Sequence, residues 1–136
     1  MPHPMIPREE YIVSRTLRWG DVYWYDFGPR TAIHTIQNWH PALILQHDMG
    51  NRFSPTTIIT PLTSAENVHR MLPTHCLIQK SEYPELDNDS IVKLEQIFTI
   101  ERSELADQLF ITRFRQATMR RIYEKLRMSL NFGAIR

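Results

Sequence analysis

Short runs of β-branched, aromatic and aliphatic residues, separated by polar residues, glycine and proline, fill the first 100 positions of the chain. Runs of this kind, bounded by turn-forming residues, are typical of β-strands. The pattern predicts strands at 20–28, 41–47, 56–62, 73–79 and 90–100. Several strands joined by short turns favour a small antiparallel sheet that closes on itself as a barrel and so protects its edges.

The last quarter of the chain has a helical period instead. Apolar or small side chains recur every four residues there, at Phe114, Thr118, Ile122, Leu126 and Leu130. This spacing places them on one face and predicts a helix over 112–133, with Thr112 able to cap its start. A shorter helical stretch is expected over 101–109. The predicted fold is therefore an antiparallel β-barrel with helices to one side.

In two internal segments and at the N-terminus, apolar residues do not recur at a regular spacing. Residues 48–55 contain a Gly-Asn pair that tolerates positive φ and predict a turn. Residues 29–40 form a polar loop longer than most hairpin connections, and loops of that length are often functional. The first 15 residues hold three prolines and no period, so we expect a loose arm at 1–15 ahead of a single domain at 16–136.

Composition narrows the class of protein. A chain of 136 residues fits one compact domain, and its single cysteine excludes a disulfide framework. No apolar run approaches the roughly 18 residues that a membrane span requires. The N-terminus lacks the apolar segment of a signal peptide. We therefore expect a cytoplasmic protein that has no membrane partner.

The charge is unevenly distributed, although the net charge is only +1. Residues 101–136 carry 8 basic against 4 acidic side chains, whereas residues 1–100 carry 8 against 11. The C-terminal quarter can meet a phosphate backbone or an acidic protein partner. A solvated helix face explains the same excess equally well.

Candidate chemistry is concentrated where predicted strands begin or end. The residues are Asn38, His40, Thr63, Ser64, Lys93, Glu95 and Gln96. Adjacent antiparallel strands bring such positions together, although each has an ordinary explanation, such as turn capping by Thr63 and Ser64 or partial surface exposure of His40. The six histidines show no metal-ligand spacing and no phosphate-binding glycine loop is present, so no cofactor or metal is expected.

Four stretches, taken together, resemble a known family. They are "RWGDVYWYDFGP", "HPALILQHDMGNRFSPTTIITPLTS", "LPTHCLIQ" and "DSIVKLEQIFTIERSEL". In order and spacing they resemble the MazF/PemK toxins of bacterial toxin–antitoxin pairs, over roughly residues 18–130. The resemblance implies an SH3-like antiparallel barrel of the CcdB/PemK type with a C-terminal helix, assembled as a homodimer. It also implies metal-independent, sequence-specific cleavage of single-stranded RNA, and an antitoxin protein that covers the RNA groove.

The resemblance also assigns roles to residues. In the family, an Arg directly before the proline of the second strand acts with the Thr of the "LTS" motif. Thr63 is present here, whereas His40 stands in place of that Arg and Phe98 in place of another. Some members use an acid–base pair at the positions of Lys93 and Glu95.

Cleavage by the ribose 2′-OH requires a base, an acid and a donor to the phosphate. Histidine can take and return a proton near neutral pH, which arginine cannot do. We therefore predict His40, Thr63, Lys93 and Glu95 as catalytic residues. His34, in the loop before His40, is a weaker candidate. The residues predicted to bind RNA are Asn38, Ser64, Gln96, Arg52, which can contact phosphate, and Phe53, which can stack a base.

Two alternatives stay open from sequence. The first is a weakened or inactive toxin that still dimerises and binds antitoxin or nucleic acid, because both substituted arginines would have bound phosphate. The second is a topoisomerase-poisoning toxin of the same fold, against which the "GNRFSP" and "PLTS" matches speak. The RNA sequence that is cut does not follow from the chain, because base specificity depends on loop geometry.

Overall fold

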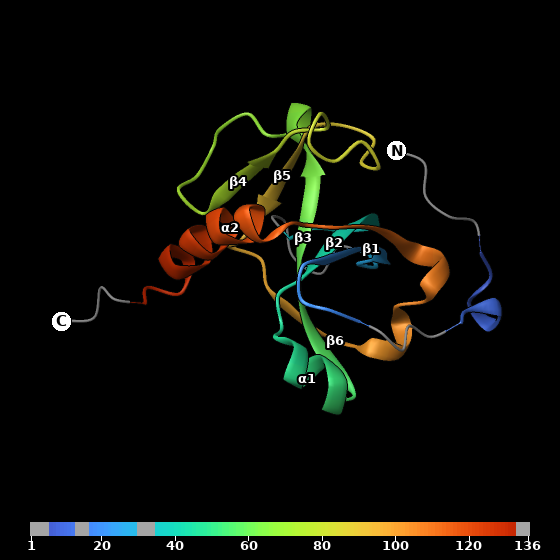
Figure 1. Cartoon of the computed structure of the whole chain (residues 1–136). Helices are drawn as coiled ribbons and strands as arrows, with labels where there is room; N and C mark the ends of the chain where they lie inside the picture. Colours follow the sequence, from blue (N-terminus) through green and yellow to red (C-terminus); the bar gives the residue numbers. More distant parts are fainter. Residues whose placement is uncertain (1–5, 13–16, 30–34, 133–136) are drawn as a thin grey trace.

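The computed structural model describes residues 6–12, 17–29 and 35–132 (Figure 1). Its strands are β1 (Asp21–Asp26), β2 (Trp39–Ile44), β3 (Thr56–Ser64), β4 (His75–Ile78), β5 (Ser90–Lys93), β6 (Phe98–Glu101) and β7 (Phe110–Arg113). Its α-helices are α1 (Asp48–Phe53) and α2 (Gln116–Ser129). Short 3-10 helices are η1 (Arg8–Glu10), η2 (Ala65–Asn67), η3 (Arg102–Glu104) and η4 (Asp107–Leu109).

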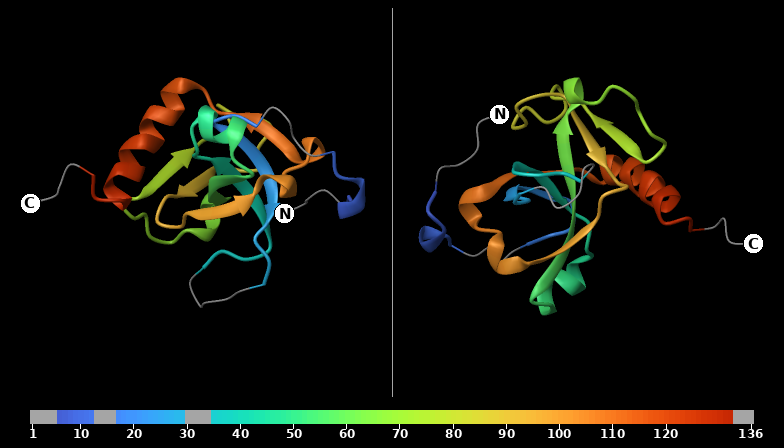
Figure 2. Two further views of the ribbon diagram at one scale, coloured as in Figure 1. Left: turned by 90° about the horizontal axis from the view of Figure 1, so that it is seen from below. Right: turned by 180° about the vertical axis from the view of Figure 1, so that it is seen from behind.

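The strands form an antiparallel sheet in the order β4-β5-β3-β2-β1-β7, and β6 also pairs with β3. β3 is the longest strand because it serves three partners. Its first half pairs with β6, its middle with β2 and its last residues with β5. The sheet consequently curls around β3, and the rear view in Figure 2 shows α2 and the segment 101–113 on opposite sides of this strand.

Strand alternation gives the sheet two apolar faces. The face toward α2 holds Val22, Leu43, Leu62, Cys76, Ile78, Tyr83, Leu86, Val92, Leu94, Phe114, Met119 and Ile122. The other face holds Leu17, Tyr23, Ala42, Ile44, Ile59, Ile100, Leu105, Ala106 and Leu109. Neighbouring residues of one strand therefore fall in different cores, as Ala42 and Leu43 do. Both sides of the curled sheet are filled, which fixes the register of the strands.

Helix α2 starts against a tyrosine from a distant loop. The Tyr83 hydroxyl accepts the backbone N–H of Arg115, the residue before the helix, at 2.8 Å. It also shares a 2.6 Å hydrogen bond with Thr118 Oγ1, and both side chains are buried. The helix begins at Gln116 rather than at the predicted position, because Thr112 belongs to β7 and its hydroxyl donates to Glu85 Oε1 at 2.8 Å.

The other differences from the predicted elements have local causes. The run 90–100 is broken by a turn after β5, so it forms two strands that pair with different parts of β3. The stretch 101–109 forms η3 and η4 instead of an α-helix. The predicted turn at 48–55 contains α1, whose start is capped because Gly50 N donates to His47 Nδ1 at 3.3 Å.

The described part of the N-terminal segment is held against η4. Asp107 N donates to Ile12 O at 2.7 Å, and Ile12 N donates to Gln108 Oε1 at 3.0 Å. Gln108 Nε2 in turn donates to Glu10 O at 2.8 Å. The domain boundary at residue 15 stays a prediction, because residues 1–5 and 13–16 lie outside the described ranges. Within those ranges, no helix has the length and apolar character needed to cross a membrane.

Candidate functional site

Three neighbouring strands bring one residue each into a single row across the sheet. Tyr25 of β1 pairs with His40 of β2. Ala42 of β2 pairs with Pro61 of β3, where the pairing of these two strands ends. His40 and Thr63 each lie two residues beyond that pair, so strand alternation turns both side chains to the same side of the sheet. Directly paired residues face the same side of the sheet, with Cβ atoms about 4.5–5.5 Å apart. Tyr25 and His40 therefore lie side by side, and Thr63 faces the same side of the sheet on the next strand.

The His40 ring is partly buried, and burial lowers its pKa below the ordinary value. The positive charge of Lys93 lowers this pKa further, whereas backbone groups of Gln37 and Leu62 act in the opposite direction. Nδ1 is buried and has no hydrogen-bond partner within the described ranges. The proximity of Leu62, which precedes Thr63, agrees with the register. The imidazole is therefore neutral near pH 7 and able to accept a proton.

Lys93, at the end of β5, faces the same side as this row. Thr63 pairs with Ile91, and Lys93 lies two residues beyond Ile91, so alternation returns its side chain to the same face. The strand end is fixed because the Thr60 hydroxyl donates to the Lys93 carbonyl at 2.9 Å. The effect of Lys93 on the pKa of His40 is consistent with this placement.

Glu95 is held by Thr74 and by His75, the first residue of β4. Its Oε1 accepts from Thr74 Oγ1 at 3.3 Å, and its Oε2 lies 3.0 Å from His75 Nε2. His75 Nδ1 accepts the backbone N–H of Leu72 at 3.1 Å, so Nε2 carries a proton and donates it to Glu95. Both carboxylate oxygens are thus engaged. In the described part of the chain, no hydrogen bond or ion pair joins Glu95 to His40.

Ser64 does not join the row. It follows Thr63 in β3, so its side chain points to the opposite face, and it is paired with Ser90. Both Thr63 and Ser64 are largely buried, at 6% and 7% exposed. Of the two hydroxyls of the "LTS" motif, only that of Thr63 faces the side that holds His40.

The loop before β2 is closed at its base. Asn38 has a positive φ of 64°, which asparagine adopts more readily than most residues. Asn38 N donates to Gly28 O at 2.8 Å, and Phe27 N donates to Asn38 O at 2.9 Å. Gln96 Oε1 accepts the backbone N–H of Ile36 at 2.8 Å. Gln96 therefore ties the loop to the segment between β5 and β6.

An aromatic cluster occupies the position where the resemblance led us to expect an arginine. The ring of Phe27 lies 5.3 Å from that of Phe98, 4.9 Å from that of Tyr25 and 6.5 Å from that of His40, measured between centroids. Phe98 thus supplies packing rather than charge. This packing contributes to the burial that keeps the His40 ring neutral.

Arg52 and Phe53 lie at the other end of the strands. They belong to α1, which Figure 1 shows beside the start of β3, whereas Thr63 is near its end. His40 and Ile44 at the two ends of β2 are about 13 Å apart, from the rise per strand residue. The Arg52 guanidinium stacks over the Phe53 ring at 5.3 Å, and Phe53 is 73% exposed. Within one copy of the chain, Arg52 and Phe53 therefore lie far from His40 and Thr63.

Two residues of this site, Tyr25 in the row and Glu104 beside it, were not predicted from the sequence. The Tyr25 hydroxyl donates to Glu104 Oε2 at 2.5 Å. Tyr25 belongs to an aromatic-rich strand, and from sequence it looks like a core residue. Only its pairing with His40 marks it as part of the site, and that pairing is known only once the strand register is known. Glu104 is 79 positions away in sequence. His34 lies outside the described residues.

The arrangement combines a neutral imidazole, a hydroxyl and an ammonium on one face. These groups can accept a proton, donate to an anionic oxygen and stabilise negative charge. Across the ranges that the structure describes, no three His, Cys, Asp or Glu side chains form a group able to hold a metal ion.

Known proteins resemble this chain along most of its length. An endoribonuclease MazF of Staphylococcus saprophyticus is 36% identical over 120 residues, which cover 88% of this chain and 96% of that protein. An endoribonuclease EndoA of Bacillus subtilis is 39% identical over 112 residues, which cover 82% of this chain and 91% of that protein. A mycobacterial endoribonuclease, solved in complex with its cognate antitoxin, superposes with a TM-score of 0.68 at 25% identity and covers 86% of this chain and 97% of that one.

These matches agree with the sequence prediction of an SH3-like antiparallel barrel with a C-terminal helix. The superposition on a solved endoribonuclease confirms that architecture. A family profile described as the PemK-like, MazF-like toxin of type II toxin–antitoxin systems matches residues 18–130. The chain therefore belongs to the PemK/MazF toxin family.

Proposed function

We propose that this protein is an endoribonuclease toxin that cuts single-stranded RNA without a metal ion and is held inactive by an antitoxin protein. The observation that carries the proposal is the row of His40 and Thr63, with Lys93 on the same face and a neutral imidazole within it. Relatives named endoribonucleases cover more than four fifths of the chain. The row is the feature that gives this activity a chemical basis here.

In the proposed reaction, the ribose 2′-oxygen attacks the adjacent phosphorus. His40 takes the 2′-hydroxyl proton as the P–O2′ bond forms, and the P–O5′ bond breaks. The products are a 2′,3′-cyclic phosphate and a 5′-hydroxyl, whose proton returns from the imidazolium or from water. Thr63 and Lys93 stabilise the negative charge on the non-bridging oxygens. DNA is not cut in this way because it lacks the 2′-hydroxyl.

The other predicted residues take supporting roles in this proposal. Glu95 keeps β4 and β5 aligned through His75, because both of its carboxylate oxygens are engaged. Asn38 and Gln96 shape the loop beside the substrate path, and Ser64 supports β3 from the opposite face. Arg52 and Phe53 contact RNA only outside the row, on a longer substrate or from a second copy of the chain.

The assembly and location are also part of the proposal. We infer a homodimer in the cytoplasm, as the family resemblance implies. The antitoxin is expected to compete with RNA for the face that holds His40. The basic C-terminal quarter, with 8 basic and 4 acidic residues, gives an acidic antitoxin segment a complementary surface.

The decisive experiment compares His40→Ala with the unaltered protein on a labelled RNA of mixed sequence. Loss of a general base is expected to slow cleavage about 10²–10⁴-fold. His69→Ala is the matched control, because His69 is exposed and lies in the loop after η2, and it is expected to cleave at the unaltered rate. Adding EDTA is expected to leave both rates unchanged.

Two results would contradict the proposal. Full activity in His40→Ala would remove His40 from the chemistry. No cleavage by the unaltered protein, together with antitoxin binding, would identify an inactive toxin instead. Mass spectrometry of the fragments checks the mechanism, since a 3′-phosphate product without a cyclic intermediate would exclude 2′-hydroxyl attack.

A further inference from the structure

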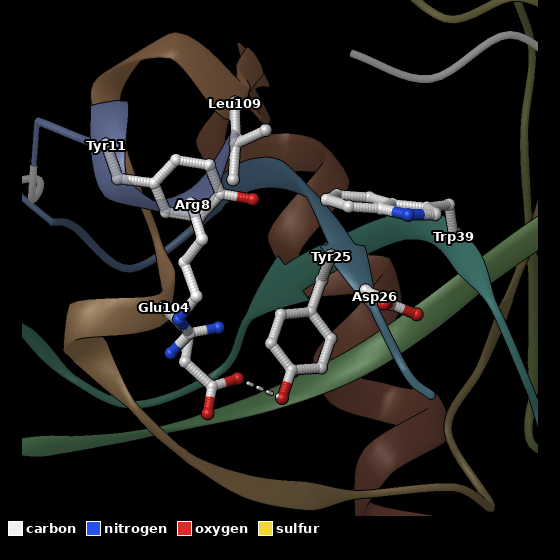
Figure 3. A pocket seen from close by; sticks show the side chains of 7 residues that line it. All are labelled: Arg8, Tyr11, Tyr25, Asp26, Trp39, Glu104 and Leu109. Carbon is white, nitrogen blue, oxygen red and sulfur yellow. Dashed lines mark hydrogen bonds between the residues drawn. The ribbon is translucent and has the colours of Figure 1, made fainter. Parts of the chain in front are cut away.

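A small cavity opens beside Tyr25 of the row. Figure 3 shows it between the N-terminal segment, β1, β2 and η3. Its main lining residues are Arg8, Tyr11, Tyr25, Asp26, Trp39 and Glu104, and we name it the Tyr25 pocket. We propose that the Tyr25 pocket receives the edge of a guanine base of the RNA and so selects the nucleotide beside the cut. This inference rests on the proposed function, and it deepens that function by naming a base.

The pocket is placed to take a base next to the reacting phosphate. Tyr25 pairs with His40, and Asp26 pairs with Trp39, the residue immediately before His40. Directly paired side chains are about 5 Å apart at Cβ. A nucleotide whose phosphate lies at His40 and Thr63 can therefore extend its base, or that of its neighbour, over Tyr25.

The polar groups of the pocket are arranged around one carboxylate. The Tyr25 hydroxyl donates to Glu104 Oε2 at 2.5 Å, which fixes the orientation of Glu104 (Figure 3). Burial, and then Glu104 itself, raise the pKa of Tyr25, so the phenol stays a neutral donor. Glu104 Oε1 forms no hydrogen bond or ion pair among the described residues and can accept N–H groups from a ligand.

Arg8 supplies the complementary donor. Arg8 lines the same pocket, and within the described ranges its guanidinium forms no ion pair or hydrogen bond. Its charge is close enough to lower the pKa of Tyr25, against the larger effect of burial. Arg8 is therefore near the phenol and its donors are available to an acceptor that enters beside Glu104.

Guanine matches this pair of groups. Its Watson–Crick edge presents the O6 acceptor next to the N1–H and N2–H donors. Arg8 can donate to O6 while Glu104 accepts from the two N–H groups. Uracil offers a single N–H between two carbonyls, whereas adenine and cytosine each place a ring acceptor beside their amino group, so each satisfies fewer of these contacts.

A phosphate is a poorer occupant than a base. Asp26 and Glu104 both line the pocket, and two carboxylates repel an anion near Arg8. The cavity has a volume of about 80 Å³. That is less than the roughly 150 Å³ that hold a benzene molecule in an engineered protein cavity, so only the edge of a flat ring enters. The ring face then lies against Trp39 or Tyr11, as bases do on aromatic side chains.

The test changes Glu104 and measures base preference by two independent readouts. A random-sequence RNA is cut with the unaltered protein, with Glu104→Gln and with the control Glu101→Gln, and the fragment ends are sequenced. Glu101 is exposed, lies three residues away and is outside the pocket. We expect guanine at one fixed position next to the cut, a preference that falls about tenfold in Glu104→Gln and is unchanged in Glu101→Gln.

The second readout does not need cleavage. Short RNAs that carry 2′-O-methyl groups throughout, and that contain either guanine or inosine at the same position, are bound to each variant and followed by fluorescence anisotropy. Inosine lacks the N2 amino group, so the unaltered protein is expected to bind it several-fold more weakly and Glu104→Gln to bind both equally.

The outcomes separate this proposal from the proposed function. Cleavage without any guanine preference overturns the pocket assignment and leaves the nuclease intact. Absence of cleavage with a guanine preference in binding contradicts the nuclease and supports the pocket. Equal binding of guanine and inosine RNAs by the unaltered protein overturns the assignment whether or not RNA is cut. Circular dichroism of each variant confirms that it is folded.

Discussion

At the scale of single residues, an imidazole in place of a guanidinium changes what the site can do. An arginine stays charged and can only donate to the phosphate. His40 is partly buried and close to Lys93, and both effects lower its pKa. Its neutral form therefore prevails at neutral pH, and the residue acts as a base at the start of the reaction. Lys93 then supplies the positive charge that the arginine of the family would have supplied.

The pH dependence of cleavage follows from this. A base works only when it is deprotonated, and the pKa of His40 lies below the ordinary value of about 6.5. We expect kcat/KM to be constant down to about pH 6.5 and to fall at lower pH. The rate measured from pH 4.5 to 8 checks this. A loss of rate that begins well above pH 6.5 would contradict the base role.

Lys93 provides a second prediction at this scale. Removing its charge in Lys93→Met relieves one cause that lowers the pKa of His40, so this pKa is expected to rise. Lys93→Arg keeps the charge and is the matched control. Titration of the His40 ring protons by NMR measures both variants. An unchanged pKa in Lys93→Met would show that the ammonium does not act on the imidazole.

At the scale of elements, loops and caps depend on partners that are remote in sequence. The start of α2 is stabilised by Tyr83, and Gln96 holds the loop before β2 through Ile36. The sequence predicted α2 and the burial of Thr118 and Ile122 correctly. It placed the start of the helix at Thr112, and it assigned to the buried face Leu130, which is exposed and follows the helix end at Ser129. The spacing of apolar residues indicates which face of the helix is buried. It does not locate the helix start, because the capping hydroxyl of Tyr83 comes from another part of the chain.

Tyr83→Phe tests the helix cap. It leaves the N–H of Arg115 and the hydroxyl of Thr118 without their common partner. Because Thr118 is buried, we expect a loss of about 1–3 kcal/mol in the free energy of unfolding. Tyr123→Phe is the control on the exposed side of α2 and is expected to change little. Urea unfolding measures both, and equal stabilities would contradict the assignment.

Gln96→Ala tests the tie between the loop and the site. Ile36 N loses its side-chain acceptor, so we expect faster hydrogen exchange at this amide and a lower rate of cleavage. Gln79→Ala, at an exposed position after β4, is the control. Unchanged exchange at Ile36 would show that the loop is held in another way.

At the scale of the whole molecule, β3 organises the fold, since it pairs with three strands and ends in Thr63. The sequence predicted the strands of the first 80 residues closely, because their apolar runs are separated by clear turns. The sequence did not predict β7 or the division of 90–100 into β5 and β6. These strands are only four residues long, so their pairing partners define them, and their hydrophobic pattern does not. The family resemblance selected His40 and Thr63, but their place in one row with Tyr25 follows only from register.

The resemblance also predicts a dimer. The chain has a mass of 16.2 kDa, and light scattering after gel filtration is expected to report twice that value. Addition of an acidic antitoxin peptide is expected to inhibit cleavage while leaving the dimer intact. A monomer at micromolar concentration would contradict the expected assembly.

Cys76 is the single cysteine of the chain and lies in the core that faces α2, where burial raises the pKa of its thiol. Cys76 is 4% exposed and lies at the cavity between β4 and α2, so a thiol reagent reaches it more readily when these two elements separate. The rate of its chemical labelling thus reports the opening of this core without any engineered probe. Slower labelling in the presence of antitoxin would measure how far partner binding restrains that opening.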